Sequence, residues 1–366
     1  MKAAVLYAAG QPLQVEELSV DNPRRGEVMV RVAAGGVCHS DLHVLNGDLP
    51  APLPVVLGHE GAGVVERVGD DVTDFQPGDH VIFLWRASCG RCFYCLSGRP
   101  ALCELGAGIR WSGHLADGTS RFRKGDQEIR HFAGVSSFAE RTVLPREGLV
   151  KIDPSVPLEK AAIIGCAVMT GVGAVINTAR VEPGASMAVI GCGGVGLNVV
   201  QGGVLAGAEK IIAIDVLDNK LEFARRLGAT HLINASQGDP VSVVKELTGG
   251  RGVDYAFEVI GNPRTIVQGY QMIRRGGTLV VVGVAPSGAE VAFNAASIML
   301  DEKTIRGSLY GSCRPGLDVP RLIGLYQAGR LKLDELISRV YPIEQINAAF
   351  DALRRGEVAR SIIRFS

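Results

Sequence analysis

Hydrophobic and polar residues alternate in short runs through the first part of the chain. Runs such as 27–32, 63–68 and 80–84 are separated by glycine, proline and aspartate, which favour turns. Alternation with a period of two is typical of β-strands that bury one face. The sequence up to residue 167 therefore predicts a compact, β-rich domain.

Beyond that point, short apolar runs alternate with longer segments of helical periodicity. The predicted strands are 186–190, 210–215, 254–260 and 277–282, and the predicted helices begin at Val195 and Asn219 or span 264–272. Strands and helices that alternate in this way form a parallel, doubly wound sheet. The fold class is therefore α/β, with the sheet in residues 168–309.

The last section, residues 310–366, has two helical patterns, 320–328 and 343–355, followed by a closing strand. We expect it to return to the first domain. The longest uncharged run, 161–179, is interrupted by glycine, threonine and asparagine. It therefore predicts a buried helix rather than a membrane span.

Composition narrows the classes of function. The 366 residues suffice for two domains, and 38 basic residues balance 38 acidic ones. This balance gives no support for a nucleic acid or an anionic membrane as partner. The first residues lack the apolar run of a signal peptide. Eight cysteines without such a signal predict a cytoplasmic protein whose thiols bind metal.

Four of these cysteines lie close together in a loop-like stretch rich in glycine. They are Cys89, Cys92, Cys95 and Cys103. Short Cys-x-x-Cys turns deliver thiolates in pairs, as a tetrahedral zinc ion requires. An iron–sulfur cluster of the ferredoxin type places its fourth cysteine after three residues and before proline, whereas here Glu104 follows the fourth cysteine. Disulfides and unliganded buried thiols fit a polar, non-secreted loop poorly. The stretch therefore predicts a structural zinc site.

The doubly wound region begins with a dinucleotide motif. Gly191, Gly193 and Gly196 form G-x-G-x-x-G between an apolar run and a predicted helix, with Gly194 and Val195 between them. The glycines allow a tight turn, approach to a pyrophosphate and close packing of helix on strand. Asp215 ends the next predicted strand, where a carboxylate accepts hydrogen bonds from the adenosine ribose of NAD.

Several further motifs follow one another in a fixed order. They are Gly36–Asp41 with its cysteine, Gly58–Gly61 (G-H-E-G), the four-cysteine stretch, Gly165-Cys166 with Thr170 four residues later, and Gly191–Gly196. In this order, and over essentially the whole chain, the sequence resembles the zinc-dependent medium-chain alcohol dehydrogenases. The similarity is greatest to the long-lobe branch that includes class III and aryl-alcohol enzymes. It implies a GroES-like catalytic domain (1–167, zinc lobe 86–108), a Rossmann coenzyme domain (168–309) and a catalytic-domain return (310–366).

The resemblance also implies roles for individual residues. Cys38, His59 and Cys166 match the catalytic zinc ligands, so that two zinc ions are expected per chain. Glu60 would approach the metal during ligand exchange, and Asp41 would orient His59. Ser40 and His43 would relay the alcohol proton to solvent. The positions matching cofactor contacts are His39, Thr170, Gly191, Gly193, Gly194, Val195, Gly196, Asp215, Lys220, Val282, Val284 and Arg360.

The implied activity is zinc- and NAD-dependent interconversion of alcohols and aldehydes by hydride transfer. Trp85, Val284 and Leu309 would line the substrate pocket, which favours primary alcohols with aromatic or allylic bodies. Trp85 alternatively packs as core at the base of the lobe. A homodimer formed by edge strands of the coenzyme domains is expected, with a tetramer as the alternative.

A second activity stays open on the same resemblance, the oxidation of S-(hydroxymethyl)thiol adducts of formaldehyde by class III enzymes. Against it, the basic residue that class III enzymes place after the lobe is here Ala107, and their acidic pair aligns with Leu49 and Ala51. Arg110 is a candidate substitute for the missing basic residue. The zinc-free quinone reductases are disfavoured because they lack both cysteine sets.

Overall fold

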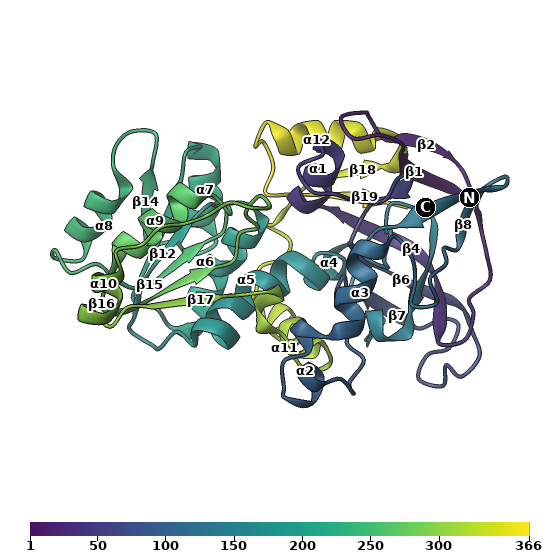
Figure 1. The fold of residues 1–366 in the computed structure, drawn as a ribbon, viewed down its shortest axis with the longest axis horizontal. Coiled ribbons are helices and arrows are strands. Elements are labelled where there is room, and N and C mark those ends of the chain that lie inside the picture. The colour runs from purple at the N-terminus through teal and green to yellow at the C-terminus, as the bar shows by residue number, and fades with distance from the viewer. Residues whose placement is uncertain (366) are drawn as a thin grey trace. The chain divides into compact units, whose positions relative to one another are not determined.

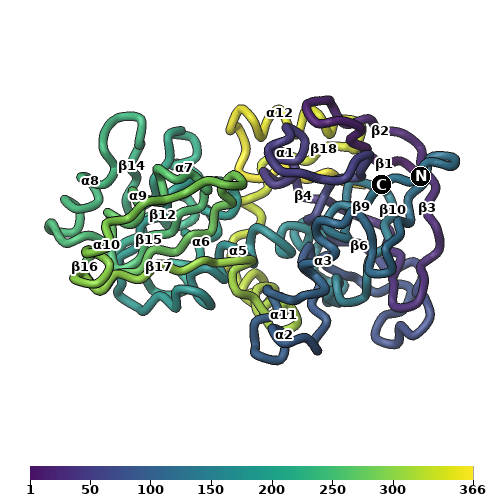
Figure 2. The backbone as a smooth tube through the Cα atoms, in the orientation of Figure 1, coloured from purple at the N-terminus to yellow at the C-terminus, as the bar shows by residue number. Residues whose placement is uncertain are grey.

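The computed structural model describes residues 1–365, which form two compact units (Figure 1). Unit 1 comprises Met1–Cys166, Arg314–Leu325 and residues from Leu336 onward, and unit 2 comprises Ala167–Cys313 and Tyr326–Glu335. The chain thus returns to unit 1 at its end, and the tube in Figure 2 shows purple N-terminal and yellow C-terminal segments in the same unit. The closing strand, β19 (Arg360–Arg364), pairs antiparallel with β4 (Glu27–Val37) in unit 1.

Unit 1 is built on two sheets. One has the strand order β2-β1-β5-β9-β8-β3, and the other has the order β11-β7-β6-β4-β19-β18, with β10 paired to β4. The strands are β1 (Lys2–Leu6), β2 (Gln14–Glu17), β3 (Ser19–Val20), β4 (Glu27–Val37), β5 (Val55–Val56), β6 (Glu60–Val68), β7 (His80–Phe83), β8 (Phe122–Lys124), β9 (Gln127–His131), β10 (Arg141–Pro145), β11 (Leu149–Ile152), β18 (Ile337–Pro342) and β19 (Arg360–Arg364).

Strand β4 organises this unit because it pairs with β6, β10 and β19. Its alternating valines at 28, 30 and 32 are at most 1% exposed, as the period-two pattern predicts for a strand with a buried face. Strand β6 begins at Glu60, three residues before the apolar run that predicts it. The earlier start arises because Glu60–Ala62 pair with the end of β4.

Unit 2 contains one parallel sheet with the order β14-β13-β12-β15-β16-β17, the arrangement of a doubly wound dinucleotide-binding fold. Its strands are β12 (Ser186–Ile190), β13 (Lys210–Asp215), β14 (His231–Asn234), β15 (Val253–Glu258), β16 (Ile273–Val281) and β17 (Thr304–Gly307). Its helices include α6 (Gly194–Ala206), α7 (Asp218–Arg226), α8 (Pro240–Leu247), α9 (Pro263–Met272) and α10 (Ala295–Leu300). The α/β fold class is confirmed.

The remaining helices connect and cover these sheets. They are α1 (His39–Asn46), α2 (Phe93–Leu96), α3 (Glu104–Ser112), α4 (Leu158–Ala161), α5 (Met169–Gly173), α11 (Pro315–Gln327) and α12 (Ile346–Arg354). Helix α11 begins five residues before Pro320, which the sequence pattern takes as its start, because Pro315 opens the helix instead.

The apolar segment Leu158–Ala179 is long and apolar enough to cross a membrane, but 83% of its most apolar window is buried in protein. Two π-helical turns, Ile164–Val168 and Ala174–Ala179, interrupt it. The expectation of a buried helix over 161–179 is therefore confirmed.

Candidate metal centres and dinucleotide loop

Four potential ligands converge in the interior of unit 1. Cys38, His59, Glu60 and Cys166 each offer one atom, and these atoms all lie within 4.8 Å of one another. Each of the four side chains is at most 7% exposed. A buried group of two thiols, an imidazole and a carboxylate is costly unless charges are paired or a metal is bound.

Strand pairing explains why these residues meet. The register of β4 and β6 sets Gly36 opposite Glu60, so Cys38 and His59 lie just beyond the same end of the pair. A side chain on Gly36 would place its Cβ 2.2 Å from Glu60 Oε2, and only glycine leaves room for the glutamate. Cys166 reaches the cluster from the π-helical turn Ile164–Val168.

The distances in this cluster suit zinc. Zinc–sulfur bonds of about 2.3 Å and zinc–nitrogen bonds of about 2.0 Å place tetrahedral ligand atoms roughly 3.5 to 3.8 Å apart. Cys166 Sγ lies 3.4 Å from His59 Nε2. The other ring nitrogen, Nδ1, lies 3.0 Å from Asp41 Oδ2, so Asp41 orients the imidazole with Nε2 toward the thiols. Asp41 is itself held by the Gly58 N–H, which donates to Oδ1 at 3.0 Å.

Glu60 has a different neighbour. Arg360 on β19 is 3% exposed, and its Nη2 lies 3.0 Å from Glu60 Oε1. Burial raises the pKa of Glu60 to about 8, although the guanidinium of Arg360 favours the charged carboxylate. The Arg360 Nη1 also donates to the carbonyl of Val37 at 3.0 Å. Arg360 thus anchors the glutamate beside the ligand set, while its predicted contact with a pyrophosphate stays a prediction.

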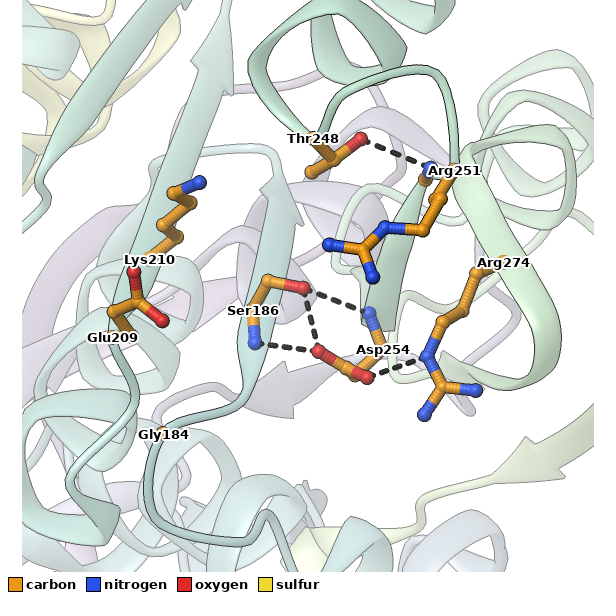
Figure 3. Close-up of a pocket in the computed structure, with 9 residues that line it drawn as sticks. Gly184, Ser186, Glu209, Lys210, Thr248, Arg251, Asp254 and Arg274 are labelled. Atoms are coloured by element: carbon orange, nitrogen blue, oxygen red, sulfur yellow. Dashed lines mark hydrogen bonds and ion pairs between the residues drawn. The ribbon is translucent and has the colours of Figure 1, made fainter.

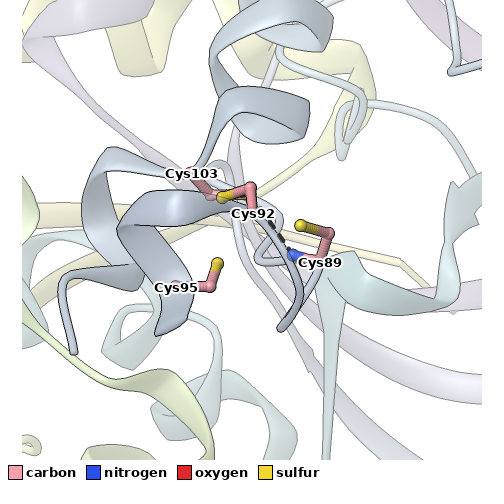
Figure 4. A group of neighbouring side chains, drawn as sticks. All are labelled: Cys89, Cys92, Cys95 and Cys103. Atoms are coloured by element: carbon pink, nitrogen blue, oxygen red, sulfur yellow. Dashed lines mark hydrogen bonds between the residues drawn. The ribbon is translucent and has the colours of Figure 1, made fainter. Parts of the chain in front are cut away.

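The second thiol group forms the lobe (Figure 4). Cys89, Cys92, Cys95 and Cys103 also lie with their sulfur atoms within 4.8 Å of one another. Cys92 and Cys103 are separated by 3.9 Å between sulfurs, close to the edge of a zinc–thiolate tetrahedron. The Cys89 N–H points at Cys103 Sγ at 3.3 Å, as backbone amides do toward metal-bound thiolates. The two thiol-containing groups are therefore candidate zinc sites, one structural and one catalytic.

An arginine that the sequence analysis missed belongs to this lobe. Arg86 is 9% exposed, and its Nε donates to the carbonyl of Ala101 at 3.0 Å. Burial lowers the pKa of Arg86, and the thiol of Cys103 opposes that change. Four thiolates around one zinc ion carry two net negative charges, which Arg86 partly balances. The only sequence signal was its position three residues before Cys89.

The glycine loop in unit 2 has the geometry expected of a phosphate-binding turn. Gly191 has a left-handed φ of 98°, and a Cβ on Gly196 would lie 1.8 Å from the Gly191 carbonyl oxygen. Asp215 lies at the end of β13, where its carboxylate accepts the N–H groups of Cys192 at 2.8 Å and of Val216 at 2.8 Å. These bonds tie the acid to the glycine loop and fix it at the carboxyl end of the sheet.

The other predicted site residues divide between the two units. In unit 1, Ser40 and His43 lie on α1 beside exposed His39, and Ser40 Oγ is 4.0 Å from Cys38 Sγ. In unit 2, Thr170 is buried on α5 and Lys220 lies on α7, whereas Val284 and Leu309 are 49% and 39% exposed. Val282 donates its N–H to the Glu258 carbonyl at 2.8 Å. Their roles toward cofactor and substrate stay predictions.

Trp85 has an unexpected neighbour. The guanidinium carbon of Arg110 on α3 lies 4.3 Å from the centre of the Trp85 ring and 4.5 Å from that of Trp111. Trp85 is 7% exposed, whereas Trp111 is 44% exposed. Among the described residues, no carboxylate forms an ion pair with Arg110. Burial lowers the pKa of Arg110 to about 10, and the thiols of Cys166 and Cys38 oppose that change. The two indole rings contact the guanidinium through their faces.

A separate polar cavity of about 170 Å³ lies at the amino ends of β12, β13 and β15 (Figure 3). There, Asp254 Oδ2 accepts the N–H and the hydroxyl of Ser186 at 2.7 and 2.6 Å, and Arg274 Nε donates to Oδ1 at 2.6 Å. Dinucleotides bind at the carboxyl ends of such strands. This network therefore joins the starts of neighbouring strands and is not the cofactor site.

Comparison with known proteins agrees with this geometry over the whole length. Residues 24–154 match the family described as alcohol dehydrogenase GroES-like domain, and residues 194–327 match the zinc-binding dehydrogenase family. The chain is 42% identical to the NDMA-dependent alcohol dehydrogenase of Amycolatopsis methanolica, covering 100% of this chain and 99% of that relative. The chain belongs to the zinc-binding medium-chain alcohol dehydrogenases.

Two further relatives represent different branches of these alcohol dehydrogenases. The class-3 alcohol dehydrogenase of Cereibacter sphaeroides is 42% identical, over 100% of this chain and 99% of the relative. The crystal structure of benzyl alcohol dehydrogenase from Acinetobacter calcoaceticus is 37% identical with a TM-score of 0.95, over 100% of this chain and 99% of that one. The membership confirms the predicted family and leaves the substrate to be argued from the site.

Proposed function

We propose that this alcohol dehydrogenase uses NAD to oxidise primary alcohols with aromatic or allylic bodies, and reduces the aldehydes in reverse. The observation that carries the proposal is the buried convergence of Cys38, His59 and Cys166, with Asp41 behind the imidazole. Two thiolates and one imidazole leave a fourth tetrahedral position for a substrate oxygen. When bound, zinc supplies Lewis acidity and NAD supplies a hydride acceptor.

The protein's own groups then handle the proton. Ser40 and His43 are three residues apart on α1, so their side chains lie on the same face of the helix. We expect Ser40, whose Oγ lies 4.0 Å from Cys38 Sγ, to take the alcohol proton, and His43 to be the outer end of the relay. His43 is 38% exposed and releases the proton to water. In aldehyde reduction the same groups work in the opposite direction.

The preference for NAD rests on Asp215. Its carboxylate lies at the end of β13, the second strand of unit 2 along the chain, where a ribose hydroxyl is bound in such folds. A 2′-phosphate would meet a like charge there, and the next two residues, Val216 and Leu217, offer no cation in compensation. NADP is therefore expected to bind much more weakly than NAD.

The aromatic preference rests on Trp85 and on the similarity to benzyl alcohol dehydrogenase. An aromatic body buries roughly 100 Å² more apolar surface than ethanol, worth ~2.5 kcal/mol at about 25 cal/mol per Å². We expect kcat/KM for benzyl alcohol to exceed that for ethanol by tens-fold. The near-complete burial of Trp85 supports the alternative that this ring is packing at the base of the lobe.

A second candidate activity is favoured by Arg110. Its guanidinium has no carboxylate partner among residues 1–365 and could bind an anionic substrate group, such as the carboxylate of a thiol adduct. Relatives named class-3 alcohol dehydrogenase and S-(hydroxymethyl)glutathione dehydrogenase, each 42% identical, support this activity. We rank it second because a formaldehyde–thiol adduct gains nothing from an aromatic wall.

One substrate panel separates these activities. The zinc-loaded enzyme is assayed with NAD and benzyl alcohol, cinnamyl alcohol, ethanol, 2-propanol, or formaldehyde plus glutathione, following the absorbance of reduced nicotinamide. Highest kcat/KM for benzyl or cinnamyl alcohol supports the proposal. Highest kcat/KM for formaldehyde with thiol supports the second candidate, and 2-propanol as best substrate contradicts both.

We also propose a homodimer formed through the free edge of the unit 2 sheet. Strand β17 ends the sheet, and Met299 and Leu300 of α10, which precedes β17 in the chain, are 71% and 69% exposed. An exposed strand edge with apolar neighbours is unfavourable in a monomer. Sedimentation equilibrium tests the dimer, and a monomer or tetramer as the main species would contradict it.

A further inference from the structure

The exposed end of helix α1 holds a carboxylate against the predicted proton acceptor. The helix ends at Asn46, and Gly47 takes a left-handed φ of 88° that reverses the chain. The N–H of Asp48 then donates to the carbonyl of His43 at 2.8 Å, and that of Leu49 donates to the same oxygen at 3.1 Å. These backbone bonds fix Asp48 next to His43.

The side chains meet as the backbone directs. His43 Nδ1 lies 3.1 Å from Asp48 Oδ2, and the two side chains are 38% and 57% exposed. A carboxylate only accepts hydrogen bonds, so Nδ1 carries the hydrogen. In the neutral ring, Nε2 is then the nitrogen with a free lone pair, and it alone can take up a proton.

The other charged groups at this end of α1 either bond to other residues or lie farther from the His43 ring than Asp48 does. The His39 ring centre lies 6.4 Å from that of His43 on the same helix. From α12, Arg354 donates to Asn46 Oδ1 at 3.2 Å and to Asp351 Oδ1 at 2.8 Å. Among the described residues, Asp48 is the one acid in an ion pair with His43.

We propose that Asp48 is a positioning residue for proton release, because it holds His43 in the Nδ1–H tautomer and stabilises the ring once protonated. The inference rests on the proposed function, in which the alcohol loses a hydride to NAD and a proton to the Ser40–His43 pair. The proton that reaches Nε2 creates a positive ring beside the carboxylate and then leaves for water. In the whole reaction only the alcohol is oxidised and only NAD is reduced.

A purely structural ion pair would behave differently. An exposed pair adds little to stability, and if His43 takes no part in proton release the loss of the pair leaves the pH dependence of catalysis unchanged. Removing a carboxylate that acts on His43 leaves the protonated ring without its counter-charge, which alters the acid limb of the kcat/KM profile and lowers the plateau rate.

The first experiment measures kcat/KM for benzyl alcohol from pH 5.5 to 10 in the zinc-loaded enzyme. Asp48→Asn keeps a hydrogen-bond acceptor without the charge, Asp48→Ala removes both, and Asp48→Glu restores the charge. We expect the acid limb of the kcat/KM profile to move in the Asn and Ala variants and to return to its wild-type position in Asp48→Glu. The plateau should fall about threefold in Asp48→Ala, less than the roughly tenfold or larger loss on removing the base.

Two controls test specificity. Asp351→Asn removes an exposed carboxylate on the helix next to α1 and should leave the profile unchanged. In a His43→Gln background, Asp48→Ala should have no further effect on kcat/KM, because its action passes through the imidazole. Additive losses in the double variant would overturn the inference.

The second readout is independent of turnover. ¹⁵N NMR of histidine-labelled enzyme at high pH reports which ring nitrogen carries the hydrogen, and His43→Gln assigns the signals. We expect the Nδ1–H form in the wild type and a shift toward Nε2–H in Asp48→Ala. If the wild type oxidises alcohols but neither the acid limb nor the tautomer changes in Asp48→Ala, the inference fails and the proposed function stands. If the wild type oxidises no alcohol with NAD, both fail together.

Discussion

A buried histidine in unit 1 should make the protein sensitive to mild acid. His131 on β9 is 2% exposed, and its ring centre lies 4.5 Å from that of Phe122. Its Nε2 accepts the N–H of Arg121 at 3.2 Å and is therefore unprotonated. Burial, together with the positive charge of Arg121, lowers the pKa of His131 to about 3.

The sign and size of the effect follow from linkage. In the unfolded chain the imidazole titrates near 6.5, so between pH 6.5 and 3 the unfolded state binds a proton that the folded state does not. Stability is therefore complete above that window and is lost as the pH falls through it. At pH 5, which is 1.5 units below the unfolded value, the loss is about 2 kcal/mol at 1.36 kcal/mol per unit.

Urea unfolding of the zinc-loaded enzyme at pH 7.5 and 5.0, followed by tryptophan fluorescence, measures this loss. His131→Gln keeps an acceptor for the Arg121 N–H but does not titrate, so its stability should fall about 2 kcal/mol less between the two pH values. Half-exposed His231 in unit 2 provides the matched control, His231→Gln, which should behave as the wild type. Equal losses in wild type and His131→Gln would refute the reasoning.

Further outcomes are expected for zinc content, cofactor preference and substrate range. Elemental analysis should find two zinc ions per chain, and one zinc ion in the wild type would contradict this count. Cys95→Ala should lose one zinc ion and unfold at a lower temperature, because a structural metal site adds folding free energy. Cys38→Ala should stay folded but be inactive. Asp215→Gly should narrow the preference for NAD over NADP, mainly by weakening the binding of NAD. Equal use of both cofactors by the wild type would refute the proposed role of Asp215. If the second activity is present, Arg110→Gln should lower kcat/KM for formaldehyde with thiol more than kcat/KM for benzyl alcohol. Trp85→Ala should widen the range of alcohols that the enzyme oxidises. If the Trp85 ring only packs the lobe, Trp85→Ala should instead lower the melting temperature alone.

Much of the fold could be predicted because its signals are local. The predicted strands 186–190 and 210–215 match β12 and β13 residue for residue, and the helix predicted over 264–272 differs from α9 by one residue. Parallel strands buried on both faces are nearly continuous apolar runs, which a sequence displays directly. Helix α1 was not predicted, because its eight residues carry four polar groups with expected roles in the site and lack a clear apolar period.

The zinc-type residues could be found for a related reason. A tetrahedral metal restricts both the kind of ligand and its spacing, so Cys-x-x-Cys turns and the G-H-E segment are recognisable without a structure. That Cys38, His59 and Cys166 would meet could be expected only by resemblance, since 107 residues separate the imidazole from its sulfur neighbour. The strand register that joins them is a property of the folded sheet.

The partners of the buried arginines could not be predicted from the sequence, because a guanidinium interacts with many kinds of group. Arg121 is fully buried against Glu27, 94 residues away, Arg360 is buried against Glu60, and Arg110 lies between two indole rings. Charge balance fixes the need for a counter-charge but not where along the chain it lies. Arg121 and Arg360 have carboxylate partners, whereas Arg110 contacts two aromatic faces and is attracted by the thiols of Cys166 and Cys38. A cation held in this way stays available to an anion, so the choice between a neutral aromatic alcohol and an acidic thiol adduct depends on a contact that only the folded chain reveals.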